Sequence, residues 1–123
     1  MIEVFSTNID VDAGAAIPFN NVSIKKGCTA DLSGSSTISL NKCGVYMVAV
    51  DASASASTTI QMLEDGVAQP QAQSTGITPS FVTLVQVSEN NCACPCASAT
   101  DLQITSTAAV TFTNVNVTVT KIV

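Results

Sequence analysis

The stretch from Asn41 to Ala56 most constrains what this chain can fold into. It opens with a turn-like Asn-Lys-Cys-Gly and then continues without proline or glycine. Residues 45–50 are apolar at every position, whereas alanine alternates with Asp51 and serine after them. This pattern indicates a strand covered on both faces at its start and on one face at its end. We predict the central strand of a packed sheet here. Alanine propensity would also allow a helix over residues 52–57, but the valine-rich flank favours a strand.

The rest of the chain has the same all-β character. Short segments of alternating apolar residues are separated by Gly, Pro and Asn turns, and no segment has helical periodicity over a full helix length. Ser33–Ser36 predicts a hairpin loop, Asp65-Gly66 a tight turn, and Ser80–Ser88 a second strand that is apolar on both faces. About eight short strands of this kind fit an all-β, two-sheet antiparallel sandwich of jelly-roll type.

The two ends of the chain carry further signals. Residues 1–8 read as an N-terminal lead-in arm and residues 9–123 as a single jelly-roll domain. Pro18 cannot donate to a strand ladder, so residues 8–22 are expected to form a broken edge strand. The alternation of valines changes phase near Thr113 and Asn114, which predicts a β-bulge or a short turn there.

Charge and residue content argue against several classes of function. The net charge is −5, with four Lys and no Arg, which disfavours nucleic acid and anionic membrane surfaces as partners. No signal peptide and no apolar run of membrane-spanning length is visible. The absence of His removes Ser-His-Asp and Cys-His catalysis and most zinc or iron enzymes. We therefore predict a protein without catalytic, cofactor-binding or metal-binding residues.

The carboxylates do not change this interpretation. They are scattered along the chain, and most fall in or beside predicted turns: Glu3, Asp10, Asp12, Asp31, Asp51, Glu64, Asp65, Glu89 and Asp101. A glycoside hydrolase would need two of them to face each other across a cleft. Solvated acids at turns are the better interpretation.

The five cysteines are the most unusual chemical feature. Cys28 and Cys43 flank the predicted hairpin symmetrically, so they could form a disulfide or be small buried side chains. Cys92, Cys94 and Cys96 could converge on a soft metal, or they could form disulfides with each other or with the first pair. Both questions stay open from the sequence.

A shortage of large side chains suggests self-assembly. The chain has four Phe, one Tyr and no Trp. A thin core of this kind can gain apolar burial by sharing surface between subunits. The small side chains of Ala52–Ser57 would allow close approach of a neighbour at a three-fold axis. We therefore expect Ala54→Arg to impair assembly more than folding, and Val48→Asp to impair folding itself.

Several of these segments together resemble a known family. They are Gly44-Val-Tyr46-Met-Val48-Ala-Val50, then Ser57–Met62 with Asp65-Gly66-Val67, then Phe81–Val87, Asp101–Ile104 and Val115–Ile122. Over residues 9–123 the chain resembles the C1q/TNF-like jelly roll, in the bacterial and phage version similar to the C-terminal domain of collagen-like spore-surface glycoproteins. The resemblance implies a compact homotrimer with the Gly-x-Tyr strand in the inner sheet. The sequence contains no collagen-like Gly-X-Y repeat, and the cysteine cluster has no place in the family pattern.

By analogy, an acidic jelly roll without a secretion signal looks like a phage virion accessory protein. We expect a non-enzymatic, homotrimeric capsid decoration, head fibre or tail fibre protein, assembled in the host cytoplasm and exposed on the virion surface. It would bind the shell, and it could also bind a host-surface carbohydrate or protein. The alternative is a binding module of a bacterial cell or spore surface that recognises carbohydrate or protein.

Overall fold

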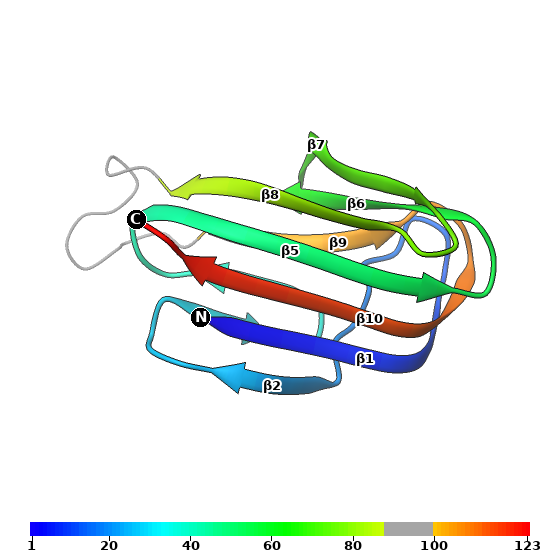
Figure 1. The fold of residues 1–123 in the computed structure, drawn as a ribbon, viewed down its shortest axis with the longest axis horizontal. Helices are drawn as coiled ribbons and strands as arrows, with labels where there is room; N and C mark the ends of the chain where they lie inside the picture. The colour runs from blue at the N-terminus through cyan, green and yellow to red at the C-terminus, as the bar shows by residue number, and fades with distance from the viewer. Residues whose placement is uncertain (88–99) are drawn as a thin grey trace.

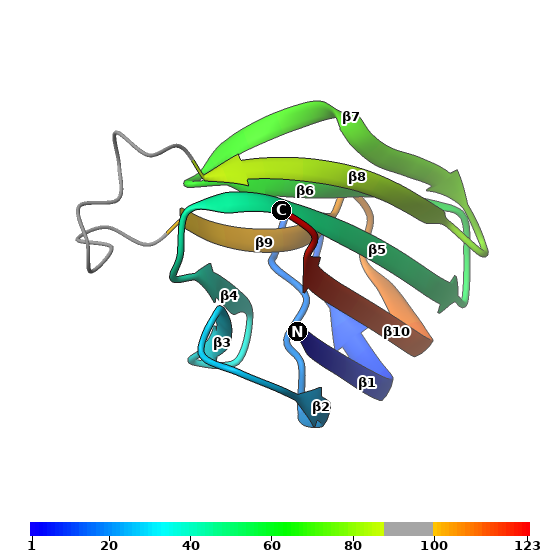
Figure 2. The ribbon, with the colours of Figure 1, turned by 60° about the vertical axis from the view of Figure 1, so that its left-hand side comes forward.

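Two five-stranded antiparallel sheets lie face to face in the computed structural model, which describes residues 1–87 and 100–123 (Figure 1). The first sheet has the order β2 (Asn21–Lys25), β1 (Ile2–Val11), β10 (Val110–Lys121), β5 (Gly44–Ala54) and β8 (Ser80–Val87). The second has the order β3 (Ala30–Ser33), β4 (Thr37–Leu40), β9 (Thr100–Ser106), β6 (Thr58–Glu64) and β7 (Val67–Gly76). Figure 2 shows the two layers from the side.

The core lies between the sheets and follows the period of two expected of strands. Each strand of the first sheet except β2 contributes alternate side chains to it, for example Tyr46, Val48 and Val50 of β5. Ile60 and Met62 of β6 meet them from the second sheet, both fully buried. The predicted all-β jelly-roll sandwich is confirmed. None of the described residues forms a helix, so none of them forms a helix that could cross a membrane.

The predicted strand after Asn41 is confirmed as β5, although two details differ. β10 occupies the middle of the sheet, and β5 lies between β10 and the edge strand β8. The expectation that residues 45–50 are covered on both faces is wrong for a single chain. Tyr46 and Val48 face the core, whereas Met47 is 36% exposed on the opposite face. Two layers enclose one interior, so the outer face of β5 has no third layer against it.

The change of phase in the valine alternation near Thr113 is a β-bulge, which was one of the two predicted alternatives. β10 continues through it as one strand, and its register with β5 shifts between Phe112 and Asn114. On the other side of β10, Asn8 of β1 adopts a φ of 52°, between the regular pairs Thr7–Asn114 and Ile9–Phe112. The extra residue returns both halves of β10 to the core face, with Phe112 and Val115 fully buried.

The N-terminal segment differs from its prediction. β1 runs without a break from Ile2 to Val11 and lies inside the sheet, between β2 and β10. The predicted boundary between a lead-in arm (residues 1–8) and the domain therefore falls within a strand, and Ile2 and Val4 are fully buried in the core. The alternation of Ile2, Val4 and Ser6 with more exposed residues is the sequence signal for this strand.

The broken edge strand expected over residues 8–22 is also not what forms. Residues 12–20 connect β1 to the short edge strand β2 of the same sheet, and on the way they hydrogen-bond to the second layer. Ile17 and Phe19 are buried in the core, and their amides donate to the Ile104 and Ser35 carbonyls of the opposite layer. Pro18 lies in this connection, and its carbonyl accepts a bond from the Ser6 hydroxyl.

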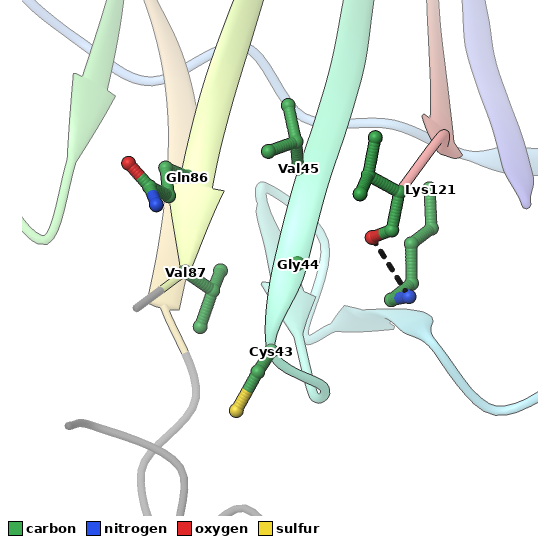
Figure 3. Close-up of a pocket in the computed structure, with 7 residues that line it drawn as sticks. Cys43, Gly44, Val45, Gln86, Val87 and Lys121 are labelled. Carbon is green, nitrogen blue, oxygen red and sulfur yellow. Dashed lines mark hydrogen bonds between the residues drawn. The ribbon is translucent and has the colours of Figure 1, made fainter. Parts of the chain in front are cut away.

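Gly44 starts β5 at a point where the end of the chain approaches very closely (Figure 3). The Val45 amide donates to the Val123 carbonyl at 3.3 Å, and the Ile122 amide donates to the Val45 carbonyl at 2.8 Å. A Cβ on Gly44 would lie 2.3 Å from the Val123 carbonyl oxygen and 2.7 Å from Cε of Lys121. Gly44 also has a φ of 144°, which glycine favours. A residue with a side chain would displace the C-terminal end of β10.

Tyr46 anchors the turn before β5 through hydrogen bonds of its hydroxyl group while its ring packs in the core. Its ring is fully buried, and its hydroxyl donates to the Lys42 carbonyl at 2.7 Å. The same oxygen lies 3.3 Å from the Thr29 carbonyl and accepts from the Lys42 amide at 3.3 Å. The Gly-x-Tyr spacing therefore places two stabilising contacts at the start of β5. Gly44 leaves room for the C-terminal residues to pack against the strand, and Tyr46 hydrogen-bonds to the preceding turn.

We predict that Gly44→Ala destabilises the fold by about 1–3 kcal/mol, because it adds backbone strain and a steric clash. Gly34→Ala is the matched control, since Gly34 also has a positive φ of 68° but a Cβ at this position would have no atom within 4 Å. Urea unfolding of both variants measures the difference. Equal losses at the two positions would contradict a role for close approach of the C-terminal residues.

We predict that Tyr46→Phe costs about 1 kcal/mol of unfolding free energy, because the part-buried Lys42 carbonyl loses its donor while the ring volume is kept. Urea unfolding measures this cost, and the slope of the transition should not change. An unaltered unfolding midpoint would show that the hydroxyl contributes nothing to the turn.

Candidate assembly interface

An exposed apolar surface covers the outer side of β5 and β8, and we call it the β5–β8 face. Met47, Val82 and Leu84 are 36%, 65% and 58% exposed. Met47 pairs across the strands with Leu84, and Ala49 pairs with Val82, so these side chains form one continuous group. Exposed apolar side chains that gather in one place make this face the candidate for an interface.

This surface forms because two strands with the same pattern are neighbours. β5 and β8 are each largely apolar on both faces, and the antiparallel register joins them over eight consecutive pairs. Thr83, Val85 and Val87 of β8 face the core, which leaves Val82 and Leu84 outside. The sequence predicts both strands but not their shared outer face, because pairing between distant strands is not visible in a single strand's pattern.

Within the described residues, the edge of this surface lacks three of the usual protections against pairing. β8 contains no charged residue, no proline and no register shift against β5. Natural edge strands are normally blunted by charge, proline or a bulge. At one end, Asp51 pairs with Ser80 and bounds the apolar group. A shallow cavity of about 470 Å³ lies there, lined by residues that include Asp51, Phe81, Val82 and Asn116.

The neighbouring part of the same outer face is polar. The Glu3 carboxylate accepts hydrogen bonds from the Ser23 hydroxyl at 2.6 Å and the Thr118 hydroxyl at 3.1 Å. These bonds, that from Ser23 above all, hold the pKa of Glu3 below its ordinary value, since they favour the charged form. Asn116 and Thr118 continue this polar surface along β10. A charged and hydrogen-bonded strip therefore borders the β5–β8 face on the β10 side.

Two alanines of the segment Ala52–Ser57, where we expected a neighbouring subunit at a three-fold axis, face the core instead. Ala52 is 4% exposed and faces the core, and Ala54 packs against the core beside it. The Ala54 amide donates to the Ile77 carbonyl at 2.7 Å. The small side chains thus suit close packing of the two sheets at this end of the sandwich.

From this packing we expect Ala54→Arg to impair folding rather than assembly, since a long cation would enter the edge of the core. Ser53→Arg is the matched control, because Ser53 lies on the opposite face of the same strand. Thermal unfolding should show a loss of several degrees for Ala54→Arg and little change for Ser53→Arg. A normally stable Ala54→Arg protein that no longer self-associates would instead place Ala54 at a subunit interface.

A larger cavity of about 590 Å³ lies where β5 begins and β8 ends (Figure 3). Cys43, Gly44, Val45, Gln86, Val87 and Lys121 contribute to its lining. The Lys121 ammonium donates to the Val123 carbonyl at 2.9 Å. The described side chains that line this cavity include one cation, that of Lys121, and no carboxylate or hydroxyl group.

The fold does bring two carboxylates together, at the turn between β6 and β7. Asp65 and Asp101 line a small cavity with Thr37, Gly66 and Gln103. Asp65 Oδ1 accepts from the Asp101 amide at 2.9 Å, and Asp101 Oδ1 accepts from the Ser39 hydroxyl at 2.8 Å. The first bond fixes the turn to β9, and the second joins β9 to β4. Burial, and secondarily the charge of Asp65, raises the pKa of neighbouring Glu64.

The structure answers one of the two open questions about the cysteines. Cys28 is an exposed free thiol, whereas Cys43 is disulfide-bonded, so a Cys28–Cys43 disulfide is not formed. Cys28 lies in the turn between β2 and β3, and Cys43 lies in the turn before β5. Cys92, Cys94 and Cys96 lie outside the described residues. Among the described residues, no group of three or more His, Cys, Asp or Glu could hold a metal ion.

Comparison with known proteins supports the fold. No protein-family model matches the chain, and no curated protein matches it in sequence. Among solved structures, the PRD1 vertex protein P5 is similar with a TM-score of 0.69 and 10% sequence identity. The match covers 99% of this chain and 96% of that chain. At this identity the likeness concerns the arrangement of the strands, and the chain shares this all-β jelly-roll architecture.

Proposed function

We propose that this chain is a non-enzymatic structural protein of a phage virion surface, in the class of capsid decoration, head fibre or tail fibre proteins. The observation that carries the proposal is the β5–β8 face, an uncharged apolar surface on the outer side of the sandwich. Such a surface needs a protein partner to remove it from water. Another copy of the chain is the first such partner, and a shell protein is the second.

Two further observations support this proposal. The similar structure is named as a vertex protein, which is a structural position in a virion, although the likeness in itself concerns the fold. The resemblance to the C1q/TNF-like family implies a homotrimer with the Gly-x-Tyr strand in the inner sheet. β5, which begins with Gly44 and Tyr46, belongs to the sheet that carries the exposed face.

The alternative remains a binding module of a bacterial cell or spore surface. The same apolar face would support assembly in that setting, and binding of a host carbohydrate or protein belongs to both proposals. Proteomics of purified virions against purified cell envelopes or spores distinguishes them. Enrichment in virions supports the phage role, and enrichment in envelopes or spores supports the alternative.

We predict that the purified protein has a native mass three times that of one chain at micromolar concentration, and that Leu84→Lys weakens assembly at least tenfold. A lysine at an exposed position of the face costs little in folding but must be desolvated in the assembly. Val67→Lys is the matched control, because Val67 is 63% exposed on β7 of the other sheet. Native mass spectrometry and light scattering measure both. A wild-type protein that stays monomeric overturns the assembly proposal.

A further inference from the structure

Three of the four sheet edges formed by the described residues carry features that discourage pairing with another strand. β2 has Lys25 and a register shift against β1. β3 has only four residues, Asp31 among them. β7 has Pro70 and a register shift against β6. The fourth edge is β8, which has eight residues, no charge, no proline and a regular register with β5 (Figure 1).

The hydrogen bonds beside β8 determine which of its backbone groups face outward. The Ala52 amide donates to the Pro79 carbonyl at 3.0 Å, one step beyond the Asp51–Ser80 pair, so Ala52 and Pro79 form a hydrogen-bonded pair of the antiparallel ladder. Such pairs alternate with pairs whose members do not bond each other. The residues of β8 whose amides and carbonyls point toward β5 are therefore Phe81, Thr83, Val85 and Val87. Those whose amides and carbonyls point to the open side are Ser80, Val82, Leu84 and Gln86.

Most of these outward backbone groups have no partner in a single chain. The Ser80 amide donates to the Ser74 hydroxyl of β7 at 3.2 Å. No hydrogen bond between described residues reaches the backbone amide or carbonyl of Val82, Leu84 or Gln86 from the open side. The side chains of Val82 and Leu84 are also 65% and 58% exposed. An added strand would therefore meet a free donor and a free acceptor at every second residue.

A second copy of the chain supplies a matching strand, namely its own β8. The other described edges of that copy are protected, so β8 is the edge that can pair. Two identical strands pair antiparallel about a two-fold axis. An axis beside Leu84 sets Leu84 against Leu84 of the second copy and Val82 against Gln86 of the second copy, so outward groups meet outward groups. No like charges oppose each other in this pairing, because β8 has no charged residue.

We infer that β8 pairs with β8 of a second copy, which joins the first sheets of two chains into one continuous sheet. This contact uses the edge of the sheet, so it is distinct from the three-fold contact proposed above and does not depend on it. Each backbone hydrogen bond replaces bonds to water and gains little net free energy. The edge contact should therefore form at a higher protein concentration than the trimer, and it would join two trimers into a hexamer.

Hydrogen exchange of the full chain, measured residue by residue at rising protein concentration, tests the inference. The amides of Val82 and Leu84 should exchange at least tenfold more slowly at high concentration, because they become bonded across the two-fold axis. Thr75 on the β7 edge provides the control. Its ladder partner Thr59 accepts from the Thr107 amide of the next strand, so the Thr75 amide also points to an open side. The Thr75 amide should exchange at the same rate at every concentration.

Val82→Pro tests the same contact by removing one outward N–H while keeping an apolar side chain. Proline is tolerated on an edge strand where the N–H faces solvent. The variant should pair at least tenfold more weakly than the wild type in sedimentation velocity, whereas the matched Thr75→Pro variant should pair normally. Circular dichroism with an unfolding midpoint within several degrees of wild type shows that both variants are folded. If Val82→Pro does not fold, hydrogen exchange of the wild type decides the question.

The outcomes separate this inference from the assembly proposed above. At high concentration the wild type should contain six chains if the trimer also forms, and two chains if it does not, and either result supports the edge contact. A wild type that stays trimeric or monomeric overturns it, as do Val82 and Leu84 amides whose exchange does not change with concentration. Protection of these amides that appears only on purified capsids assigns the edge to a shell protein, which overturns the second copy as its occupant.

Discussion

A sandwich of two sheets can bury only one face of each sheet. The exposed apolar side chains of this protein follow from that constraint. β5 and β8 are each largely apolar on both faces and lie side by side, so one apolar side of the pair must face outward. Met47, Val82 and Leu84 are exposed as a direct result. Their exposure costs free energy of about 25 cal/mol for each Å² left in water, and burial against another protein recovers it. The assembly that we propose would use the same hydrophobic effect that forms the core.

Contacts at the start of β5 hold the C-terminal residues and the turn before β5 against this strand. Gly44 lets the last residues of the chain approach within hydrogen-bonding distance, and Tyr46 holds the turn that precedes the strand. Both contacts act on the strand that carries Met47 on its outer side. The orientation of the β5–β8 face is therefore fixed by the fold rather than by a loop, which suits a rigid structural role.

Local pattern predicted much of the fold, and the failures have physical reasons. The alternation in β5, the Asp65-Gly66 turn and the bulge at Thr113 depend on neighbouring residues, so the sequence reveals them. The placement of residues 2–8 inside the sheet depends on pairing with β10, about 100 residues away. The β5–β8 face and the inward direction of Ala54 could not be predicted from the sequence for the same reason, because both depend on which strands become neighbours. The disulfide state of Cys43 also depends on tertiary proximity, which spacing in the sequence does not reveal.

Hydroxyl-radical footprinting of the assembled protein would show whether the β5–β8 face is buried between subunits. Met47, Val82 and Leu84 are exposed in a single chain, as are Val67 and Ile77 elsewhere on the surface. We predict that Met47 and Leu84 are protected in the assembly and become reactive on dilution to the monomer, while Ile77 reacts equally in both states. Labelling of Leu84 in the assembled protein at the monomer's rate would contradict this prediction, because the β5–β8 face would then remain in water.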